Sequence, residues 1–453
     1  MAEDLADAIG SYHDLLSAGI AADSQAQLDG QLRSRGLYFG ARPLCTVLRP
    51  RFMAVSQYRY LQQRAGAILR AFERAYRQAI EDPLFRREFG LLEWEEKLAL
   101  EDPGFRDSSP TSRLDAFFVD DGNGVRFTEY NAETPAGAAY NDALAEVFMA
   151  LPAMREFRRH FETWPLGAGQ GVVDALLDVW AQWSGGRAVP RIAILDWKEV
   201  PTYSEFLLYQ GLFESQGIPC TIADPREVEY RDGQLFANGS AVDLIYKRVL
   251  LDELVQRGGL DHPVFTAVRD RAVCMANPAR CKILHKKASL AVLSDERHAG
   301  LFTSEESEAI DQHIPWTRRV EERHTEHHGR RIDLLSYVQQ NRDRLVLKPN
   351  DEYGGKGIVL GWEVNDSAWT TALQLALSEP YIVQERIILP TEPYPSMLDG
   401  TLRIADRMVD TAPFAFHDSY VDGCMTRLGT ESLLNVTAGG GSSAPTFLLA
   451  GRR

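Results

Sequence analysis

Two neighbouring stretches of the chain carry polar residues that could do chemistry, namely Arg113, Asp115, Glu129 and Asn131. The patterns of residues 114–119 and 125–131 predict two strands, joined by an Asp-Gly-Asn-Gly turn at 121–124 that is typical of a hairpin. Because side chains alternate along a strand, the first two polar residues share one face of the first strand, and the last two share one face of the second. Across a tight hairpin the two pairs can converge.

The converged group would offer two carboxylates, an amide oxygen and a guanidinium. Oxygen ligands of this kind suit Mg²⁺, with phosphate oxygens completing its coordination. The guanidinium of Arg113 would then stabilise a phosphoryl group or a tetrahedral intermediate. The alternative interpretation is the solvent-facing polar side of an ordinary hairpin, although Asp and Asn are poor strand formers.

A glycine-rich loop further along the chain predicts a phosphate site. Lys348 ends an apolar strand, and Gly354, Gly355 and Gly357 separate it from the next strand at 358–362. Such a loop lets backbone N–H groups converge on phosphate oxygens, while a fixed lysine supplies the counter-charge. The loop joins two strands and lacks the Walker A pattern. A purely structural turn is the alternative interpretation.

Residues 381–387 predict another strand, in which Gln384 and Glu385 stand near the end. A strand end of this kind can present backbone groups and a carboxylate to the edge of an adenine ring. On its own, the pattern is also that of a surface glutamate at a strand end.

The elements around these motifs predict a mixed α/β chain. Residues 1 to about 105 are mostly helical in pattern, with a long amphipathic segment at 51–80, and helical patterns return from about 138 to 185. Between 190 and 249, a strand, a helix and two further strands predict a small parallel α/β domain without a dinucleotide-binding glycine motif. Another helix is expected at 282–293, before the glycine loop.

Charge and cysteine usage argue against several classes of protein. The chain has 64 acidic and 49 basic residues, a net charge of -15, which disfavours nucleic-acid binding and is compatible with an amine substrate. Its five cysteines are scattered, so neither a disulfide framework nor a zinc site is expected, and Cys274 and Cys281 are interpreted as packed thiols. The start of the sequence lacks a signal-peptide pattern, and no apolar stretch approaches the roughly 20 residues of a membrane span. We expect a cytoplasmic protein that does not enter a membrane.

Three histidines, His324, His327 and His328, lie among glutamates and could be mistaken for a metal site. The nearby carboxylates are Glu321, Glu322 and Glu326. The HExxH pattern is missing and the surroundings are highly charged, so the segment is interpreted as a solvated face.

Together, the motifs resemble those of the circularly permuted ATP-grasp ligases, especially glutathionylspermidine and trypanothione synthetases, and more distantly eukaryotic glutathione synthetase. Those families carry an R-x-D strand followed by an E-Y-N-A-D-T-P strand that holds Mg²⁺. Here the same order is Arg-Leu-Asp at 113–115 and Glu-Tyr-Asn-Ala-Glu-Thr-Pro at 129–135, with Glu133 in place of Asp. The resemblance spans roughly residues 110 to 440.

The resemblance implies roles for individual residues. The implied metal ligands are Asp115, Glu129 and Asn131, and Arg113 would contact the reacting groups. The segment 277–287 resembles a family segment that ends in a nucleotide-binding lysine, which is Lys287 here, with Lys286 as the alternative. The other residues implied to bind ATP are Lys348, Gly354, Gly355, Gly357, Gln384 and Glu385.

The implied fold is a circularly permuted ATP-grasp fold of mixed α/β (α+β) class. Its four regions would be a helical N-terminal region, a metal-binding hairpin with helices, a small parallel α/β domain, and nucleotide-binding lobes with a C-terminal tail, at 1–105, 106–188, 189–280 and 281–453. In this tail, Arg427 and Asn435 could reach the phosphates, and the Gly439–Gly441 run could be a mobile lid or part of a flexible end.

The implied reaction joins a carboxylate to an amine through an acyl-phosphate, using ATP and Mg²⁺ and releasing ADP and phosphate. A small-molecule kinase and a non-catalytic nucleotide-binding descendant of the same fold are the alternatives. The carboxylate and amine substrates are not implied, because the stretch after Arg427 differs from that of a glutathionylspermidine synthetase and the hydrolase domain of the bifunctional enzymes is missing. Members of the superfamily are often dimers, so a homodimer is one alternative, and the sequence leaves the oligomeric state open.

Overall fold

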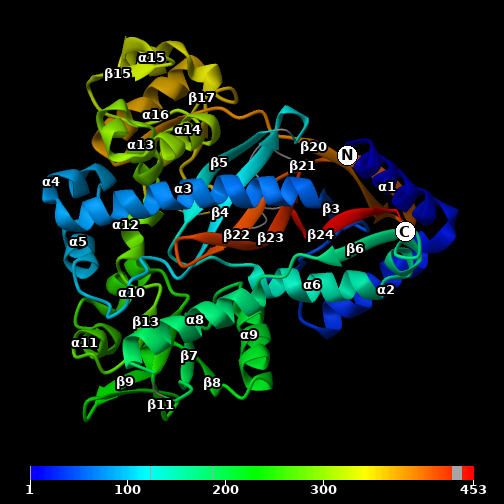
Figure 1. Cartoon of the computed structure of the whole chain (residues 1–453), viewed down its shortest axis with the longest axis horizontal. Helices are drawn as coiled ribbons and strands as arrows, with labels where there is room; N and C mark the ends of the chain where they lie inside the picture. The colour runs from blue at the N-terminus through cyan, green and yellow to red at the C-terminus, as the bar shows by residue number, and fades with distance from the viewer. Residues whose placement is uncertain (1, 123, 187, 353, 431–440, 453) are drawn as a thin grey trace.

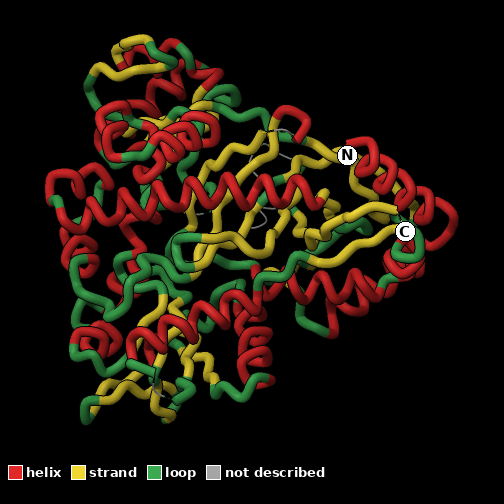
Figure 2. Tube along the Cα trace, in the orientation of Figure 1, coloured by secondary structure: helices red, strands yellow, loops and turns green. Residues whose placement is uncertain are grey.

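The structure is a computed structural model that describes residues 2–122, 124–186, 188–352, 354–430 and 441–452. A large, mostly antiparallel sheet forms the centre, and two lobes extend from the same half of the molecule (Figure 1). Figure 2 shows strands concentrated in the middle and helices around them. Both ends of the chain lie at the opposite end of the molecule, where Arg452 forms an ion pair with Asp7 at 2.9 Å.

Strands that are distant in the sequence build the central sheet, in the order β20-β21-β23-β22-β4-β5, and β24 pairs with β23, β3 and β6. These strands are β3 (Arg51–Ala54), β4 (Thr111–Val119), β5 (Gly124–Asn131), β6 (Phe161–Pro165), β20 (Thr391–Leu398), β21 (Thr401–Val409), β22 (Ala412–Phe416), β23 (Tyr420–Gly429) and β24 (Ser442–Arg452). The predicted hairpin is therefore confirmed as β4–β5.

The last strand corrects the expectation of a loose C-terminal end. β24 pairs with β23 over residues 442–445, and then with β3 on one side and β6 on the other, both at residues 447–449. Its first eight residues are buried, so the segment lacks the alternation by which a half-buried strand is recognised in a sequence. Asn435, Gly439 and Gly440 lie outside the described residues.

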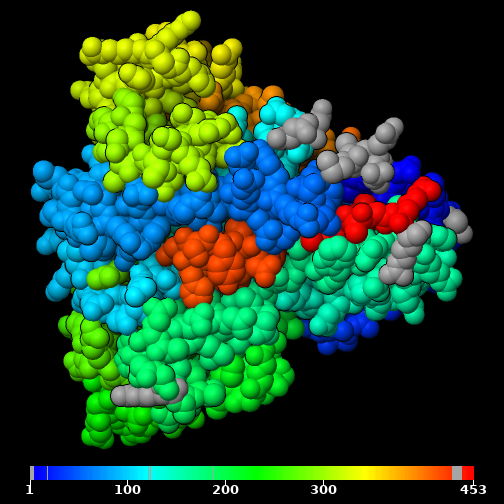
Figure 3. Space-filling view, in the orientation of Figure 1, coloured from blue at the N-terminus to red at the C-terminus, as the bar shows by residue number. Residues whose placement is uncertain are grey.

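The long helix α3 (Val55–Glu81) crosses one face of the central sheet and is visible as a band across the surface (Figures 1 and 3). Its apolar residues recur every three or four positions, and Leu61, Ile68 and Phe72 are fully buried. The ring of Phe72 stacks on Tyr130 of β5, with the centroids 4.6 Å apart. Because each such buried side chain contributes about 1.5–3 kcal/mol, this interface holds the hairpin against the helix.

The helical prediction for this segment is confirmed from Val55 onwards, but Arg51–Ala54 form β3 instead of the first helical turn. Helical patterns at 138–185 are also confirmed, except that β6 interrupts them, and Gly185 ends the last helix with a φ of +69°. The remaining helices of these regions are α1 (Ala2–Leu15), α2 (Ala21–Ser34), α4 (Pro83–Arg86), α5 (Glu93–Ala99), α6 (Ala138–Ala150), α7 (Pro152–Phe157) and α8 (Gly169–Ser184). Among the described residues, no helix is long and apolar enough to cross a membrane.

The lower lobe of Figure 1 contains the predicted parallel sheet, with the strand order β13-β12-β7-β8. Every neighbouring pair in this sheet is parallel. The elements are β7 (Ile192–Leu195), α9 (Tyr203–Ser215), β8 (Cys220–Ala223), β12 (Leu244–Lys247), α10 (Leu251–Gly258), α11 (Pro263–Arg269) and β13 (Cys274–Ala276). A small antiparallel sheet that the sequence did not predict is inserted before β12, as β9 (Val228–Arg231), β10 (Gln234–Ala237) and β11 (Ser240–Val242).

The upper lobe contains the glycine loop within an antiparallel sheet of order β14-β19-β17-β18. Its strands are β14 (Thr317–Arg319), β17 (Leu345–Pro349), β18 (Val359–Leu360) and β19 (Tyr381–Glu385), with the hairpin β15 (His324–His327) and β16 (Arg330–Asp333) beside them. Its helices are α13 (Ala288–Ser294), α14 (Ser304–His313), α15 (Leu334–Gln340) and α16 (Asp366–Ser378). Trp316, Leu347, Trp369 and Val383 form part of the core of this lobe.

The predicted helix at 282–293 is wrong as a continuous element, because it breaks into α12 (Cys281–His285) and α13. Lys286 leaves the helical conformation, with a ψ of 130°. Asn350, directly after β17, explains the break, since its side-chain oxygen accepts a hydrogen bond from the backbone N–H of Ala288 at 2.8 Å. The break places two adjacent lysines beside the glycine loop.

Candidate active site

The register of the β4–β5 hairpin brings the four polar residues of the predicted site together. Arg113 lies opposite Asn131, and Asp115 lies opposite Glu129. A bulge follows Asp115, so that Thr128 has no counterpart on β4. The predicted convergence of the two pairs on one face is confirmed.

Two guanidinium groups hold the Asp115 carboxylate. The Nε of Arg113 donates to Oδ1 of Asp115 at 2.8 Å, and a terminal nitrogen of Arg427 donates to Oδ2 at 2.7 Å. Burial alone would raise the pKa of Asp115, but the two arginines reverse the shift and hold this pKa well below its usual range. Asp115 is therefore ionised at neutral pH. Arg427 is fixed in turn by an ion pair with the fully buried Asp410.

Glu129 has a different partner, because the ammonium of Lys287 lies 3.2 Å from its Oε1. Burial opposes ionisation of Glu129, and the nearby Asp115 adds to this effect. Lys287 and Lys348 outweigh both, so the pKa of Glu129 lies below its ordinary value. The hairpin thus presents two ionised carboxylates side by side, Asp115 neutralised by Arg113 of its own strand and by Arg427 of β23, and Glu129 by lysines from other elements.

Asn131 adds an unsatisfied polar atom to this group. Its side-chain nitrogen is buried and makes no hydrogen bond to any described residue. The orphaned atom is a donor, so an acceptor such as a phosphate oxygen would satisfy it, whereas the oxygen of the same amide is the atom that could bind a metal. The donor set of Asp115, Glu129 and Asn131 consists of hard ligands and fits Mg²⁺.

Lys348 faces the hairpin from the upper lobe. Its ammonium donates to Oε1 of Gln384 at 2.7 Å and to the backbone carbonyl of Thr128 at 3.3 Å. Burial lowers the pKa of Lys348 to about 8, although Glu129 offsets part of the shift. The lysine is therefore largely charged at neutral pH and lies between the two predicted halves of the site.

The three glycines of the loop serve different purposes. Gly354 and Gly355 line the cleft and have φ values of +66° and +77°, a region that favours glycine. Gly357 has a φ of +71°, and a Cβ there would come within 2.7 Å of Pro349. Gly357 is not among the described residues that line the cleft. Glycine is therefore required at this position by the backbone conformation and by packing against Pro349.

One cleft between the hairpin and the upper lobe collects most of the predicted residues. Its charged and polar lining comprises Asp115, Thr128, Glu129, Lys348, Gln384, Glu385, Arg386 and Arg427. Its apolar lining comprises Phe117, Val346, Ile358, Leu360, Trp362, Ile387 and Leu389. An apolar surface next to a strongly charged one matches a ligand that has a flat ring and an anionic tail.

Four predicted residues stand outside the described lining of this cleft, namely Arg113, Asn131, Lys287 and Gly357. Arg113 is bound to Asp115 and donates to the carbonyl of Ala136 at 2.6 Å, so it supports the site from behind. Lys287 reaches the site through Glu129 and donates to the carbonyl of Glu352 in the glycine loop at 2.6 Å.

The contacts favour Lys287 over Lys286 as the lysine next to the site. The ammonium of Lys286 turns away and lies 2.7 Å from both Glu95 and Asp351. It belongs to a buried network that also contains Lys282 and Glu133. Sequence reasoning missed this network, because its members come from five separate segments of the chain.

Other residues of the cleft were also missed. Thr128 and Trp362 line it, and Asp410 anchors Arg427, which the sequence had suggested as a possible phosphate contact. The alternation of β5 would not have found Thr128, because the bulge changes the pairing at this residue. Cys274 and Cys281 are fully buried, in agreement with their interpretation as packed thiols.

Comparisons with known proteins identify a shared fold. The solved structure of a glutathione synthetase-like effector from Globodera pallida superimposes with a TM-score of 0.60 over 94% of this chain and 96% of that chain, at 14% sequence identity. The chain therefore has the same overall fold as that effector. No family model matches the sequence.

Sequence relatives cover shorter stretches. Uncharacterized proteins from Mycobacterium tuberculosis and Mycobacterium bovis are 34% identical over 131 residues, which is 27% of this chain and 22% of theirs. A putative glutamate–cysteine ligase from Frankia alni is 28% identical over 219 residues, which is 45% of this chain and 23% of that protein. The aligned regions thus span less than a quarter of these relatives.

Proposed function

We propose that this chain is an ATP- and Mg²⁺-dependent ligase with a circularly permuted ATP-grasp fold. It joins a carboxylate to an amine through an acyl-phosphate and releases ADP and phosphate. One observation carries the proposal: Asp115, Glu129, Arg427 and Lys348 line a single cleft with the glycine loop. The fold shared with a glutathione synthetase-like effector and the alignment with a putative glutamate–cysteine ligase support it.

In this proposal, Asp115, Glu129 and Asn131 hold Mg²⁺, which when bound neutralises charge on the phosphates. The backbone of the glycine loop and the ammonium of Lys348 orient the phosphates of ATP. Lys287 would exchange part of its contact with Glu129 for a phosphate oxygen. The apolar lining and the strand end at Gln384 and Glu385 accommodate the adenine.

The reaction needs charge stabilisation more than a general base. A substrate carboxylate attacks the γ-phosphorus of ATP in line, which gives an acyl-phosphate and ADP. The amine then attacks the acyl carbon, and phosphate leaves. Arg427 lines the cleft and offsets the charge that accumulates, whereas Arg113 acts as a positioning residue that fixes Asp115.

A binding and turnover experiment tests this function. Calorimetry with Mg-ATP should give one site, and Lys348→Met should weaken binding while Lys356→Met, at an exposed lysine of the same loop, should not. Turnover is then followed with fractionated metabolites, measuring ADP, AMP and phosphate separately. ADP and phosphate that depend on particular fractions support the ligase.

The products also separate the alternatives. Formation of AMP and pyrophosphate would contradict the acyl-phosphate mechanism. A phosphorylated product without free phosphate would instead establish the kinase alternative. Failure of Mg-ATP to bind would overturn the assignment of the cleft itself.

A further inference from the structure

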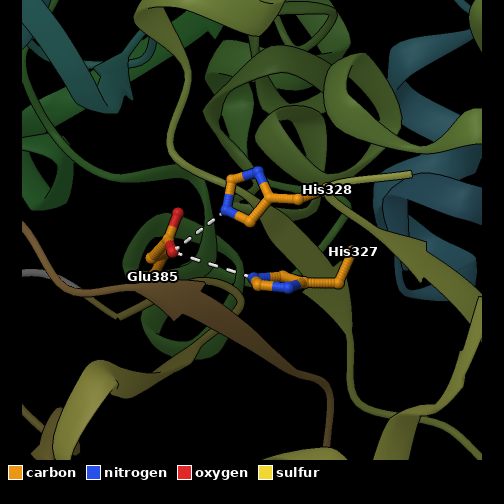
Figure 4. A group of neighbouring side chains, drawn as sticks. All are labelled: His327, His328 and Glu385. Carbon is orange, nitrogen blue, oxygen red and sulfur yellow. Dashed lines mark ion pairs between the residues drawn. The ribbon is translucent and has the colours of Figure 1, made fainter. Parts of the chain in front are cut away.

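A second group of metal-binding side chains lies at the margin of the cleft. His327 ends β15, His328 follows it, and Glu385 ends β19, and their side chains converge (Figure 4). The Nε2 atoms of His327 and His328 lie 3.7 Å and 3.5 Å from the same Oε1 of Glu385. One donor atom from each residue lies within 4.8 Å of the other two.

The backbone explains how two consecutive histidines can face the same carboxylate. Successive side chains of a strand normally point to opposite faces. His328 stands in the turn between β15 and β16 with a φ of +48°, which ends the alternation. As a result, the two imidazole rings lie next to one another, with their centroids 4.2 Å apart. His328 and Gly329 both have positive φ values, which is the usual backbone of a two-residue hairpin turn.

Neighbouring aromatic residues fix the first histidine. The ring of His327 meets Trp316 edge-on at 5.0 Å, which fixes its position, while the hydroxyl of Tyr337 lies 3.2 Å from Nε2 and would give up this contact to a metal bound there. The side chain of His327 keeps 15% of its surface exposed, whereas that of His328 keeps 71%. The side chain of His327 is thus held in place, whereas the exposed side chain of His328 is free to reorient.

We propose that His327, His328 and Glu385 bind one divalent transition-metal ion, and that Zn²⁺ fits the site best. Two imidazoles and one carboxylate are a common zinc donor set, which leaves a position for water. Two ligands at zinc distances of 2.0–2.1 Å are about 3.3 Å apart in a tetrahedral site, so the two histidine–glutamate separations need to shorten by only a few tenths of an ångström, and the two histidine nitrogens lie within 4.8 Å of one another. Mg²⁺ prefers oxygen ligands and would not favour this group.

This site is separate from the proposed magnesium site on the hairpin. It uses none of Asp115, Glu129 and Asn131. Its glutamate also lines the cleft, so a bound ion would tie the β15–β16 hairpin to β19 at the cleft margin. The sequence analysis interpreted this segment as a solvated face because the HExxH pattern is missing and the surroundings are charged, and it did not connect the histidines with Glu385, which stands 57 positions beyond His328.

Zinc calorimetry on the full chain, after treatment with a chelator, tests the site. The protein should bind one equivalent of Zn²⁺, and His328→Ala should weaken the binding at least about tenfold. His324→Ala is the matched control, since His324 is an exposed histidine on the same strand that lies outside the group. Glu385→Gln is a second variant that should also weaken zinc binding.

The outcomes distinguish this site from the proposed function. Failure of the protein to bind zinc, equal affinity in His328→Ala, or an equal loss in His324→Ala overturns the zinc site. Mg-ATP binding is measured on the same samples and should be unchanged in His328→Ala. Zinc binding without Mg-ATP binding would leave the metal site intact and refute the nucleotide cleft, and the reverse result would refute the metal site alone.

Discussion

Two glutamates four residues apart, Glu129 and Glu133, both meet lysines, but their surroundings differ. Glu133 is fully buried and accepts hydrogen bonds from the backbone N–H of Leu251 at 2.6 Å and from Lys282 at 3.1 Å. Its second lysine, Lys247, lies 3.4 Å away. Glu129 keeps 27% of its side chain exposed, pairs with Lys287 and lines the cleft.

The difference shows how the same chemistry can serve structure or function. Burial alone would raise the pKa of Glu133, but its lysines hold this pKa well below the usual range, and the charges are matched within the protein. Such a carboxylate has little capacity left for a ligand, so it joins β12, α10 and α12 to the end of the hairpin. Glu129 can exchange a lysine contact for a ligand without leaving a buried charge unpaired.

The largest expected effect is on stability and follows from removing the buried glutamate. Glu133→Ala leaves Lys247 in the interior without its counter-charge, whereas Lys282 keeps Asp351 at 2.9 Å, and the substitution should cost about 3–5 kcal/mol. Urea denaturation of the variant and of Glu129→Ala measures the contrast. Equal losses of unfolding free energy in the two variants would remove the distinction between them.

For turnover we expect the opposite order, with the larger loss from substitution of Glu129 and the smaller one from substitution of Glu133. Glu129→Gln removes a charge from the proposed magnesium site and should lower turnover about 10²- to 10³-fold, or about 2.7–4 kcal/mol of transition-state stabilisation. Its unfolding free energy should fall by less than that of Glu133→Ala. The measurement is steady-state ADP release with the active metabolite fraction, and near-normal turnover would contradict the site.

Two glycines of the loop allow the same comparison between an effect on stability and an effect on ligand binding, with smaller expected changes. Gly357→Ala forces an alanine into the left-handed region beside Pro349 and should cost about 1–2 kcal/mol of stability, with the affinity for Mg-ATP unchanged. Gly355→Ala has a similar backbone penalty, but it also lines the cleft and should weaken Mg-ATP binding. Urea denaturation and calorimetry on both variants separate the two effects. Weaker Mg-ATP binding in Gly357→Ala would restore its predicted role as a phosphate ligand.

Local patterns were sufficient to predict the hairpin, the parallel sheet and the glycine loop. Each depends on residues close in sequence: the Asp-Gly-Asn-Gly turn, an apolar run with a following helix, and glycines after Lys348. The facing of Asp115 and Glu129 does not follow from alternation alone, because the register that starts at Val119 and Gly124 would place Asp115 opposite Thr128, and the bulge brings Glu129 there instead.

Features that depend on distant partners could not be predicted in this way. The break between α12 and α13 is caused by Asn350, more than sixty residues away, and no local signal marks it. The end of the chain becomes an interior strand only because β3 and β6 flank it. Arg427 reaches Asp115 because β22 brings β23 close to β4, which is a property of the sheet order and not of either segment.

The smallest expected effect comes from the charge of Lys348. As the pH rises, this group should weaken Mg-ATP binding but increase the stability of the fold. Its pKa is lowered from 10.5 to about 8 by burial, so the charged fraction falls about tenfold between pH 7 and pH 9. Mg-ATP affinity should therefore fall about tenfold over this range. The unfolded chain binds more protons than the folded protein between pH 8 and 10.5, so this lysine's contribution to stability should rise with pH in that window.

Calorimetry and urea denaturation at pH 7, 8 and 9 measure the two trends. Lys348→Arg should flatten the pH dependence of binding, because a guanidinium stays charged throughout this range. A decline in Mg-ATP affinity that persists in Lys348→Arg would assign the pH effect to another group.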